Sequence, residues 1–175
     1  MCYIKKGIKR LICQIYRLLR NYTCTFCAEK FGDFLHNSKG GLGMIAIGAD
    51  HGGYRLKEEI KKYFEENSIE YEDYGTYSEE RTDYPIYAKK VAEAMVNGSA
   101  DKGILICRSG YGMTVVANKF KGVRAASVTS VAYAKAAKAD DDINLLTLSG
   151  DNTTIKEAIE MINAWLETEF KGGRY

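Results

Sequence analysis

The chain has 175 residues, of which 25 are Lys or Arg and 23 are Asp or Glu, so its net charge is only +2 at pH 7. This length suits one domain with a full hydrophobic core, and no apolar run approaches the ~18–20 residues that span a bilayer. The charge is divided unevenly, because the first 43 residues carry +6 and the remaining 132 carry −4. The acidic balance of the larger segment argues against nucleic acid as its main partner.

The first 43 residues form a basic segment that has several interpretations. Apolar and basic side chains alternate at helical spacing over residues 4–20, as in an amphipathic helix on an anionic membrane surface. Cys24 and Cys27, with His36, are too few ligands for a closed zinc site, and no signal-peptide cleavage site is evident. Because a regular α/β pattern begins at Met44, we expect either a disordered extension or a translation start at Met44.

From residue 44 onward, five strand patterns alternate with five helix patterns. The predicted strands are 45–48, 69–74, 102–107, 123–128 and 143–148, and the predicted helices are 52–66, 87–96, 113–120, 130–139 and 153–170. Such alternation is typical of a parallel sheet covered by helices on both faces. We therefore expect a three-layer αβα sandwich with a five-stranded parallel sheet, in the Rossmann-like, flavodoxin-type order 2-1-3-4-5.

Two polar loops are predicted to meet at the carboxyl edge of this sheet. In the expected order, the first and third strands are neighbours whose following helices lie on opposite faces, which opens a ligand crevice at their carboxyl ends. Asp50 and His51 leave the first strand, and Cys107 ends the third. After residue 43, Cys107 is the only cysteine and His51 the only histidine. A lone cysteine excludes a disulfide framework in this segment, which fits a reducing cytoplasm.

The turn after Cys107 favours chemistry on an oxyanion. Ser109, Gly110 and Gly112 belong to a glycine-flanked turn before a helix, where free backbone N–H groups point into one small volume. A thiol beside a helix N-terminus also ionises more easily. Arg108, within this turn, is either an anion ligand or a solvent-facing side chain.

Each of these residues also has a structural interpretation. Cys107 taken alone is an ordinary buried strand-end residue, and Asp50 could cap the first helix. His51 could be a solvated turn residue, and the glycines could form only a tight turn. Their predicted convergence at one edge of the sheet favours a catalytic site.

Five sets of motifs occur in order along residues 44–175. They are Gly48-Ala-Asp-His-Gly-Gly-Tyr54; Gly75-Thr with Glu80-Arg-Thr-Asp-Tyr-Pro85; Gly103-Ile-Leu-Ile-Cys-Arg-Ser-Gly-Tyr-Gly-Met113; Ala117-Asn-Lys119 with Gly122-Val-Arg-Ala125; and Gly172-Gly-Arg174. With these motifs the segment resembles the type B ribose-5-phosphate isomerase family and its galactose-6-phosphate isomerase relatives. Residues 1–43 have no counterpart in that family, which favours the later translation start.

The resemblance implies an enzyme without metal or other cofactor that interconverts an aldose phosphate and its ketose through an enediolate, most directly ribose 5-phosphate and ribulose 5-phosphate. It implies a homodimer, or alternatively a tetramer, whose sites take residues from both subunits. Cys107 would be the base that moves a proton between C1 and C2, Ser109 would help to hold the oxyanion, and Asp50 would act in ring opening. The implied substrate-binding residues are His51, Tyr84, Arg108, Gly110, Tyr111, Gly112, Asp141 and Arg174.

The chain departs from the family pattern at residues that matter for the substrate. Arg108 replaces a glycine, and Asp140 replaces the histidine expected to assist ring opening. Asp151 stands where relatives often carry a phosphate-binding arginine, and a second C-terminal arginine has no counterpart before Tyr175. We expect Asp140 to act as an acid if its pKa is raised, and Arg108 to replace a missing cation. The alternatives are the same reaction on another sugar, phosphorylated or not, and a sugar-binding homologue that has lost turnover.

Overall fold

The structure, a computed structural model, describes residues 43–173. The chain divides into two units, residues 1–41 and residues 42–175, and the architecture below is that of the second. The basic segment, its interpretations and Arg174 lie outside the described residues. Within residues 43–173, no helix is both long and apolar enough to cross a membrane.

Strands and helices alternate along the described residues, as predicted. The strands are β1 (Ile45–Ala49), β2 (Tyr71–Asp73), β3 (Lys102–Cys107), β4 (Ala125–Ser127) and β5 (Leu145–Ser149). The helices are α3 (Tyr54–Glu66), α4 (Tyr84–Val96), α5 (Tyr111–Ala117), α6 (Val131–Asp141) and α7 (Ile155–Glu167). The predicted boundaries differ from these by at most three residues.

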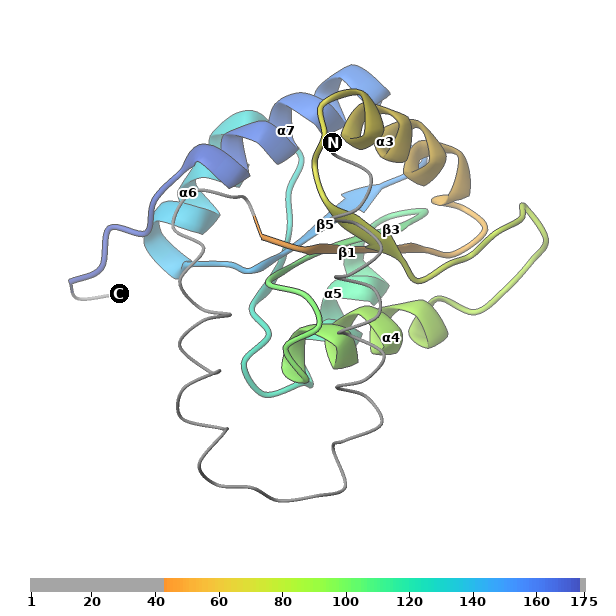
Figure 1. Cartoon of the computed structure of the whole chain (residues 1–175), viewed down its shortest axis with the longest axis horizontal. Coiled ribbons are helices and arrows are strands. Elements are labelled where there is room, and N and C mark those ends of the chain that lie inside the picture. The colour runs from red at the N-terminus through yellow and green to blue at the C-terminus, as the bar shows by residue number, and fades with distance from the viewer. Residues whose placement is uncertain (1–42, 174–175) are drawn as a thin grey trace, which may run out of the picture. The chain divides into compact units, whose positions relative to one another are not determined.

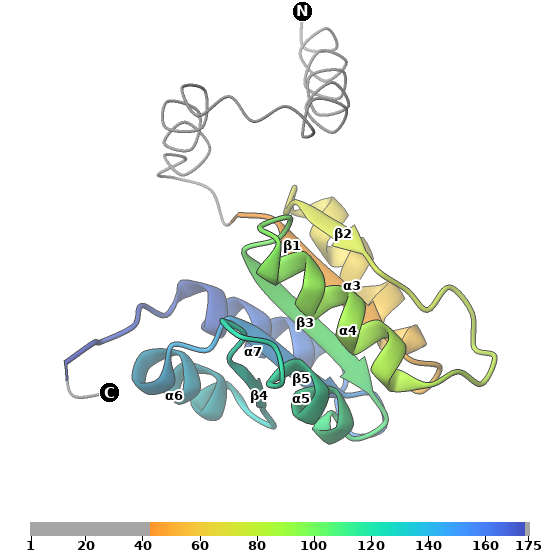
Figure 2. The same ribbon diagram turned by 90° about the horizontal axis from the view of Figure 1, so that it is seen from below.

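The five strands form one parallel sheet between two layers of helices (Figures 1 and 2). Helices α3, α6 and α7 cover one face, and α4 and α5 cover the other (Figure 1). Leu56, Ile60 and Phe64 of α3 are buried against the sheet, as their helical spacing predicted, while Tyr63 is partly buried. The predicted αβα sandwich is therefore confirmed.

The predicted strand order 2-1-3-4-5 is wrong in its last two strands. The order is β2-β1-β3-β5-β4, so β5 lies beside β3 and β4 forms an edge. All residues of β5 are buried whereas those of β4 are partly exposed, and a strand that is buried on both faces belongs inside a sheet. Because the chain turns back from β4 to β5, a right-handed connection places α6 on the face opposite α5. The loop after β5 consequently adjoins the end of β3.

Two helices begin earlier than their apolar periodicity predicted. Helix α4 begins at Tyr84 rather than at residue 87, because Asp83 is its N-cap and Pro85 fits the first turn. Helix α5 begins at Tyr111 rather than at residue 113, directly after Gly110. The first turn of α4 contains Tyr84, and that of α5 contains Tyr111 and Gly112, which the sequence assigned to the site. The helix starts therefore set the positions of these residues at the site.

Candidate active site

Cys107 ends β3, and the residue is 5% exposed. The backbone N–H of Gly110 donates to Sγ of Cys107 across 3.2 Å. Gly110 has φ +81°, and a Cβ there would lie 2.9 Å from Oγ of Ser127 and 3.2 Å from the carbonyl oxygen of Leu148. The tight turn therefore requires glycine, both for its left-handed conformation and for space. This turn aims an N–H donor at the thiol.

Asp50 lies in the loop after β1, and it is 5% exposed. Its carboxylate accepts hydrogen bonds from the backbone N–H groups of Gly52 at 2.9 Å and Gly53 at 3.2 Å. Burial raises the pKa of Asp50 above its ordinary value, although these N–H groups and the nearby His51 and Arg108 act in the opposite direction. Asp50 is thus a buried carboxyl group that retains a proton more readily than an exposed aspartate.

The predicted meeting of the loops after β1 and β3 is confirmed. The backbone N–H of Asp50 donates to the carbonyl oxygen of Ile106 across 3.1 Å. A Cβ at Gly52 would overlap the side chain of Arg108, and a Cβ at Gly53 would lie 2.5 Å from the Ile106 carbonyl oxygen. Glycines in the first loop therefore let it pack directly on the third strand.

The segment between β2 and α4 lies at the carboxyl edge of the sheet, where it contacts His51 from the loop after β1 and leads into Tyr84, the first residue of α4. Nδ1 of His51 lies 3.1 Å from the carbonyl oxygen of Thr82, a residue that the sequence had not singled out. The ring of Tyr84 packs on Gly112, where a Cβ would lie 2.8 Å from the ring. Gly112 is therefore needed for close packing between the first turns of α4 and α5.

A third loop, after β5, supports the Cys107 turn. The N–H of Gly150 donates to the carbonyl oxygen of Cys107 across 2.8 Å, and Oγ of Ser149 donates to the carbonyl oxygen of Arg108 across 2.6 Å. Nε of Arg108 donates to Oδ2 of Asp151 across 3.0 Å. The predicted strand order places β4, rather than β5, beside β3, so this support was not expected from the sequence. The run Leu145-Leu146-Thr147-Leu148 that precedes Ser149 is mostly apolar, but this pattern alone does not set the order of the strands.

A cavity of about 170 Å³ lies beside this turn. It brings together Ser109 and Tyr111 with the loops after β4 and β5. Its lining residues are Ser109, Tyr111, Thr129, Ser149, Asn152, Thr153, Glu157 and Met161. The lining carries hydroxyl and amide groups and one carboxylate but no cationic side chain, so it suits uncharged hydroxyl groups better than a phosphate.

Asp140 and Asp141 are not brought to Cys107 within one chain. They end α6 and precede β5, so they lie at the amino edge of the sheet, whereas Cys107 lies at the carboxyl edge. The four residue steps from Gly103 to Cys107 alone separate the two edges by about 13 Å. Asp140 pairs with Lys171 at 3.0 Å and, together with Asp141, lines a separate cavity of about 360 Å³.

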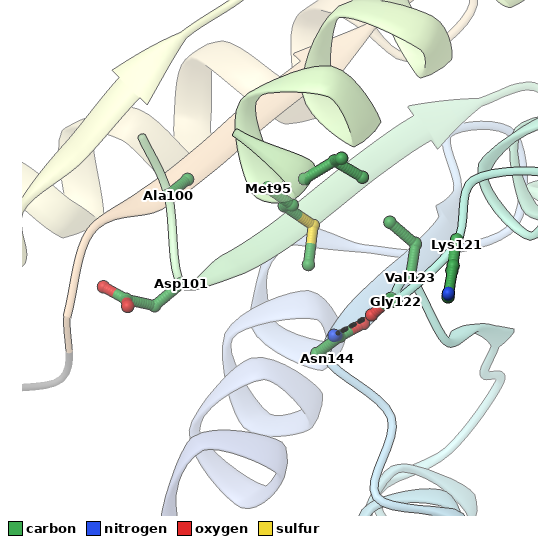
Figure 3. A pocket seen from close by; sticks show the side chains of 8 residues that line it. Met95, Ala100, Asp101, Lys121, Gly122, Val123 and Asn144 are labelled. Carbon is green, nitrogen blue, oxygen red and sulfur yellow. Dashed lines mark hydrogen bonds between the residues drawn. The ribbon is translucent and has the colours of Figure 1, made fainter. Parts of the chain in front are cut away.

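Another cavity, of about 190 Å³, also opens at the amino edge (Figure 3). Its lining residues are Met95, Val96, Ala100, Asp101, Lys121, Gly122, Val123 and Asn144. Asn144 donates to the carbonyl oxygen of Gly122 across 2.8 Å, which closes one side of the cavity (Figure 3). None of the predicted site residues lines it, so the carboxyl edge is the candidate site. Within residues 43–173, no cluster of His, Cys, Asp or Glu side chains could hold a metal ion.

Residues 45–175 match the family model described as Ribose/Galactose Isomerase. The chain belongs to this family. The resemblance inferred from the motifs is thereby confirmed, and the match covers all but the first three residues of the unit that contains the candidate site.

Curated members of the family are similar over most of their length. The chain is 41% identical over 131 residues to ribose-5-phosphate isomerase B of Escherichia coli, covering 75% of this chain and 88% of that protein. It is 38% identical over 128 residues to the galactose-6-phosphate isomerase subunit LacB of Clostridium acetobutylicum, covering 73% and 74%.

Solved structures of family members share the fold. The ribose 5-phosphate isomerase of Thermotoga maritima is 42% identical and superposes with a TM-score of 0.74, covering 75% of this chain and 91% of that one. Ribose-5-phosphate isomerase B of Mycoplasma genitalium, solved with bound ribulose-5-phosphate, is 38% identical with a TM-score of 0.70, covering 75% and 88%.

Proposed function

We propose that the protein is an aldose–ketose isomerase that interconverts ribose 5-phosphate and ribulose 5-phosphate through an enediolate. One observation carries this proposal: the buried Cys107 thiol, the Gly110 N–H that points at it and the buried Asp50 carboxyl group converge at one edge of the sheet. Family members that act on these sugars, including one solved with ribulose-5-phosphate, support the choice of substrate.

Each group has a role that follows from its chemistry. Asp50 transfers a proton during opening of the sugar ring, since its raised pKa lets a carboxyl group carry one. The Cys107 thiolate removes a proton from C2 of the open-chain aldose, which leaves an enediolate. The resulting thiol returns that proton to C1 while the hydroxyl proton passes from O2 to O1, which gives the ketose. The backbone N–H groups of Ser109 and Gly112 are donors for the oxyanion, because preorganised donors are most effective where charge develops. The N–H of Gly110 donates to Sγ of Cys107 instead. This cycle moves protons and requires no oxidant or reductant.

We further propose a homodimer whose active sites are shared between subunits. Asp140 and Asp141 lie at the opposite edge of the sheet from Cys107 of their own chain, so they can act there only from a second copy. Exposed apolar side chains on the neighbouring helices α4 and α5 support such an interface: Ile86 is 49% exposed, Tyr111 65% and Val115 59%.

Mixing two inactive variants tests the shared site. Cys107→Ala and Asp140→Ala should each be inactive alone, and subunit exchange should restore about a quarter of wild-type activity, because half of the dimers are mixed and each has one intact site. Light scattering should give the mass of two chains. A monomer, or no recovery despite demonstrated exchange, would contradict shared sites.

We also propose that the protein functions in a reducing compartment, the cytoplasm. The proposed base is a free thiol, and thiols persist where glutathione and thioredoxin keep them reduced. Localisation by fractionation of the native host tests this proposal.

A substrate panel tests the central proposal. The full chain should isomerise ribose 5-phosphate, and Cys107→Ala should lower kcat by about 1,000-fold, since general bases contribute roughly 10²–10⁴-fold. Glu160→Ala, which removes an exposed carboxylate on α7, is the control for non-specific effects. Undiminished turnover by Cys107→Ala would exclude this cysteine as the base.

Another sugar is the second candidate substrate. It is favoured by Asp151, a carboxylate at the position where family members often carry a phosphate-binding arginine, and by the cation-free cavity beside Ser109. The panel therefore includes galactose 6-phosphate and the free aldoses. A higher kcat/KM for one of these would replace ribose 5-phosphate as the substrate and leave the roles of Cys107 and Asp50 intact.

A further inference from the structure

Arg108 is held from two sides beside the turn that carries Cys107. Its carbonyl oxygen accepts from Oγ of Ser149 at 2.6 Å and from the N–H of Asp151 at 3.3 Å. Its side-chain stem occupies the space above Gly52 that a Cβ would fill. Its Nε then donates to Oδ2 of Asp151 across 3.0 Å. The loops after β1 and β5 thus fix both the backbone and the guanidinium of Arg108.

The ion pair between Arg108 and Asp151 adds little to the stability of the fold. The Arg108 side chain is 70% exposed and that of Asp151 is 45% exposed. Pairs in such surroundings contribute about 0–1 kcal/mol. Backbone hydrogen bonds already join the two loops, including the one from Gly150 to Cys107 at 2.8 Å. The main effect of the pair is to orient the guanidinium.

The oriented guanidinium has donors to spare. An arginine carries five N–H donors, and within the part of the chain that the structure describes Arg108 donates through Nε alone. Among residues 43–173, none forms a hydrogen bond with either of its Nη groups. Two adjacent Nη groups match the spacing of two phosphate oxygens, which is why arginine is common at phosphate sites.

The surrounding charges favour an anion near Arg108 rather than in the cavity beside Ser109. Among the residues that line that cavity, the charged one is Glu157, a carboxylate. Arg108, by contrast, lies close enough to the site to lower the pKa of Asp50 against the larger effect of burial. The carboxylate of Asp151 is itself neutralised by Arg108.

We propose that Asp151 is a positioning residue that holds Arg108 at Nε, so that the Nη groups of Arg108 bind the phosphate of the substrate. The inference rests on the proposed function and extends it by assigning the phosphate end of the sugar to the Arg108 side of the site. The carboxylate at residue 151 thereby takes part in phosphate binding through the arginine, without touching the ligand.

Steady-state kinetics on the full chain test this coupling. We compare Arg108→Ala, Asp151→Ala, the double variant and Asp151→Asn, with ribose 5-phosphate as substrate and inorganic phosphate as inhibitor at constant ionic strength. Arg108→Ala should raise KM and the inhibition constant of phosphate by about 10-fold or more, as for a lost charge-assisted hydrogen bond. Asp151→Ala should raise both about 3- to 10-fold with little change in kcat, because the guanidinium is present but unoriented.

The double variant and the conservative variant separate positioning from other roles. In the double variant, KM and the inhibition constant of phosphate should be no higher than in Arg108→Ala, since Asp151 acts only through the arginine. Asp151→Asn should have KM and phosphate-inhibition constants close to those of the wild type, because the asparagine Oδ1 can still accept a hydrogen bond from Nε of Arg108. Glu160→Ala, which breaks another exposed ion pair, should leave both constants unchanged.

Three results would overturn the inference. A lower KM in Asp151→Ala would show that Asp151 competes with the phosphate for Arg108. Additive increases of KM in the double variant, or an unchanged KM in Arg108→Ala, would equally contradict it. If the wild type isomerises no sugar phosphate, the proposed function fails, and calorimetric titration with inorganic phosphate then decides this inference separately. Binding that weakens in both single variants supports it, and absent or unaltered binding refutes it.

Discussion

Nζ of Lys57 lies 2.6 Å from Oδ2 of Asp73, and none of that lysine side chain is exposed to solvent. The other oxygen of the same carboxylate accepts from the N–H of Gly75 at 2.9 Å. Gly75 in turn pairs with β1, because its carbonyl oxygen accepts from the N–H of Ala49 across 2.6 Å. The buried ion pair therefore anchors the segment that leads from β2 toward His51 and Tyr84.

Replacing Lys57 by methionine should destabilise the protein by about 3 kcal/mol, because breaking a buried pair leaves an incompletely compensated charge. Lys61, which also contacts Asp73 at 2.7 Å, limits the loss. Urea denaturation measures the change. Lys62→Met, an exposed substitution on the same helix, is the control, and a loss below about 0.5 kcal/mol for Lys57→Met would show that the pair is energetically neutral.

The Asp73 carboxylate should also make stability depend on pH in the acid range. Burial opposes its ionisation, but hydrogen bonds from Lys57 and Lys61 dominate and lower its pKa below the ordinary 3.8. A group whose folded-state pKa is lowered stabilises the fold above the unfolded pKa, and this contribution is lost as pH falls through the folded pKa. In Asp73→Asn the free energy of unfolding should therefore fall less steeply below pH 4 than in the wild type. Equal slopes in urea titrations would refute this, with Glu160→Gln as the control.

Asp50 should make stability depend on pH in the opposite direction to Asp73. Burial raises its folded-state pKa above 3.8, so the stability it contributes is present at low pH and lost as pH rises through the folded pKa. Asp50→Asn should therefore raise Tm at pH 7 but not at pH 3, where the carboxyl group is protonated in both states. Its kcat should fall about 100-fold or more if it transfers a proton. A lower Tm at pH 7 would contradict the linkage.

Gly110→Ala should destabilise the turn and impair catalysis. Its φ of +81° and the nearby Leu148 carbonyl oxygen strain any side chain, which should cost about 1–3 kcal/mol and displace the N–H from Cys107. Gly122→Ala is a matched control, because Gly122 also has positive φ (+89°) but nothing within 4 Å of the added Cβ. Thermal unfolding and kcat should separate the two: both variants lose stability, whereas only Gly110→Ala should lose activity.

The alternation of apolar strands and amphipathic helices was sufficient to predict the sandwich. Leu56, Ile60 and Phe64 repeat at helical spacing, and such local periodicity determines which face is buried. The pairing of Asp50 with the Cys107 turn was also predictable, because parallel strands whose helices leave on opposite faces meet at a crevice. These features depend on local pattern and chain chirality, which a sequence contains.

Tertiary packing alone decided which strand stands beside β3. Local pattern does not fix the order of strands, since β4 and β5 are both short and compatible with a parallel sheet, and the deeper burial of β5 becomes evident only in the folded sheet. That choice brings Ser149, Gly150 and Asp151 to the Cys107 turn and pairs Asp151 with Arg108. The sequence by itself showed the chemical groups of the site. The folded sheet decided their neighbours, because contacts between residues about 40 positions apart depend on how whole strands pack.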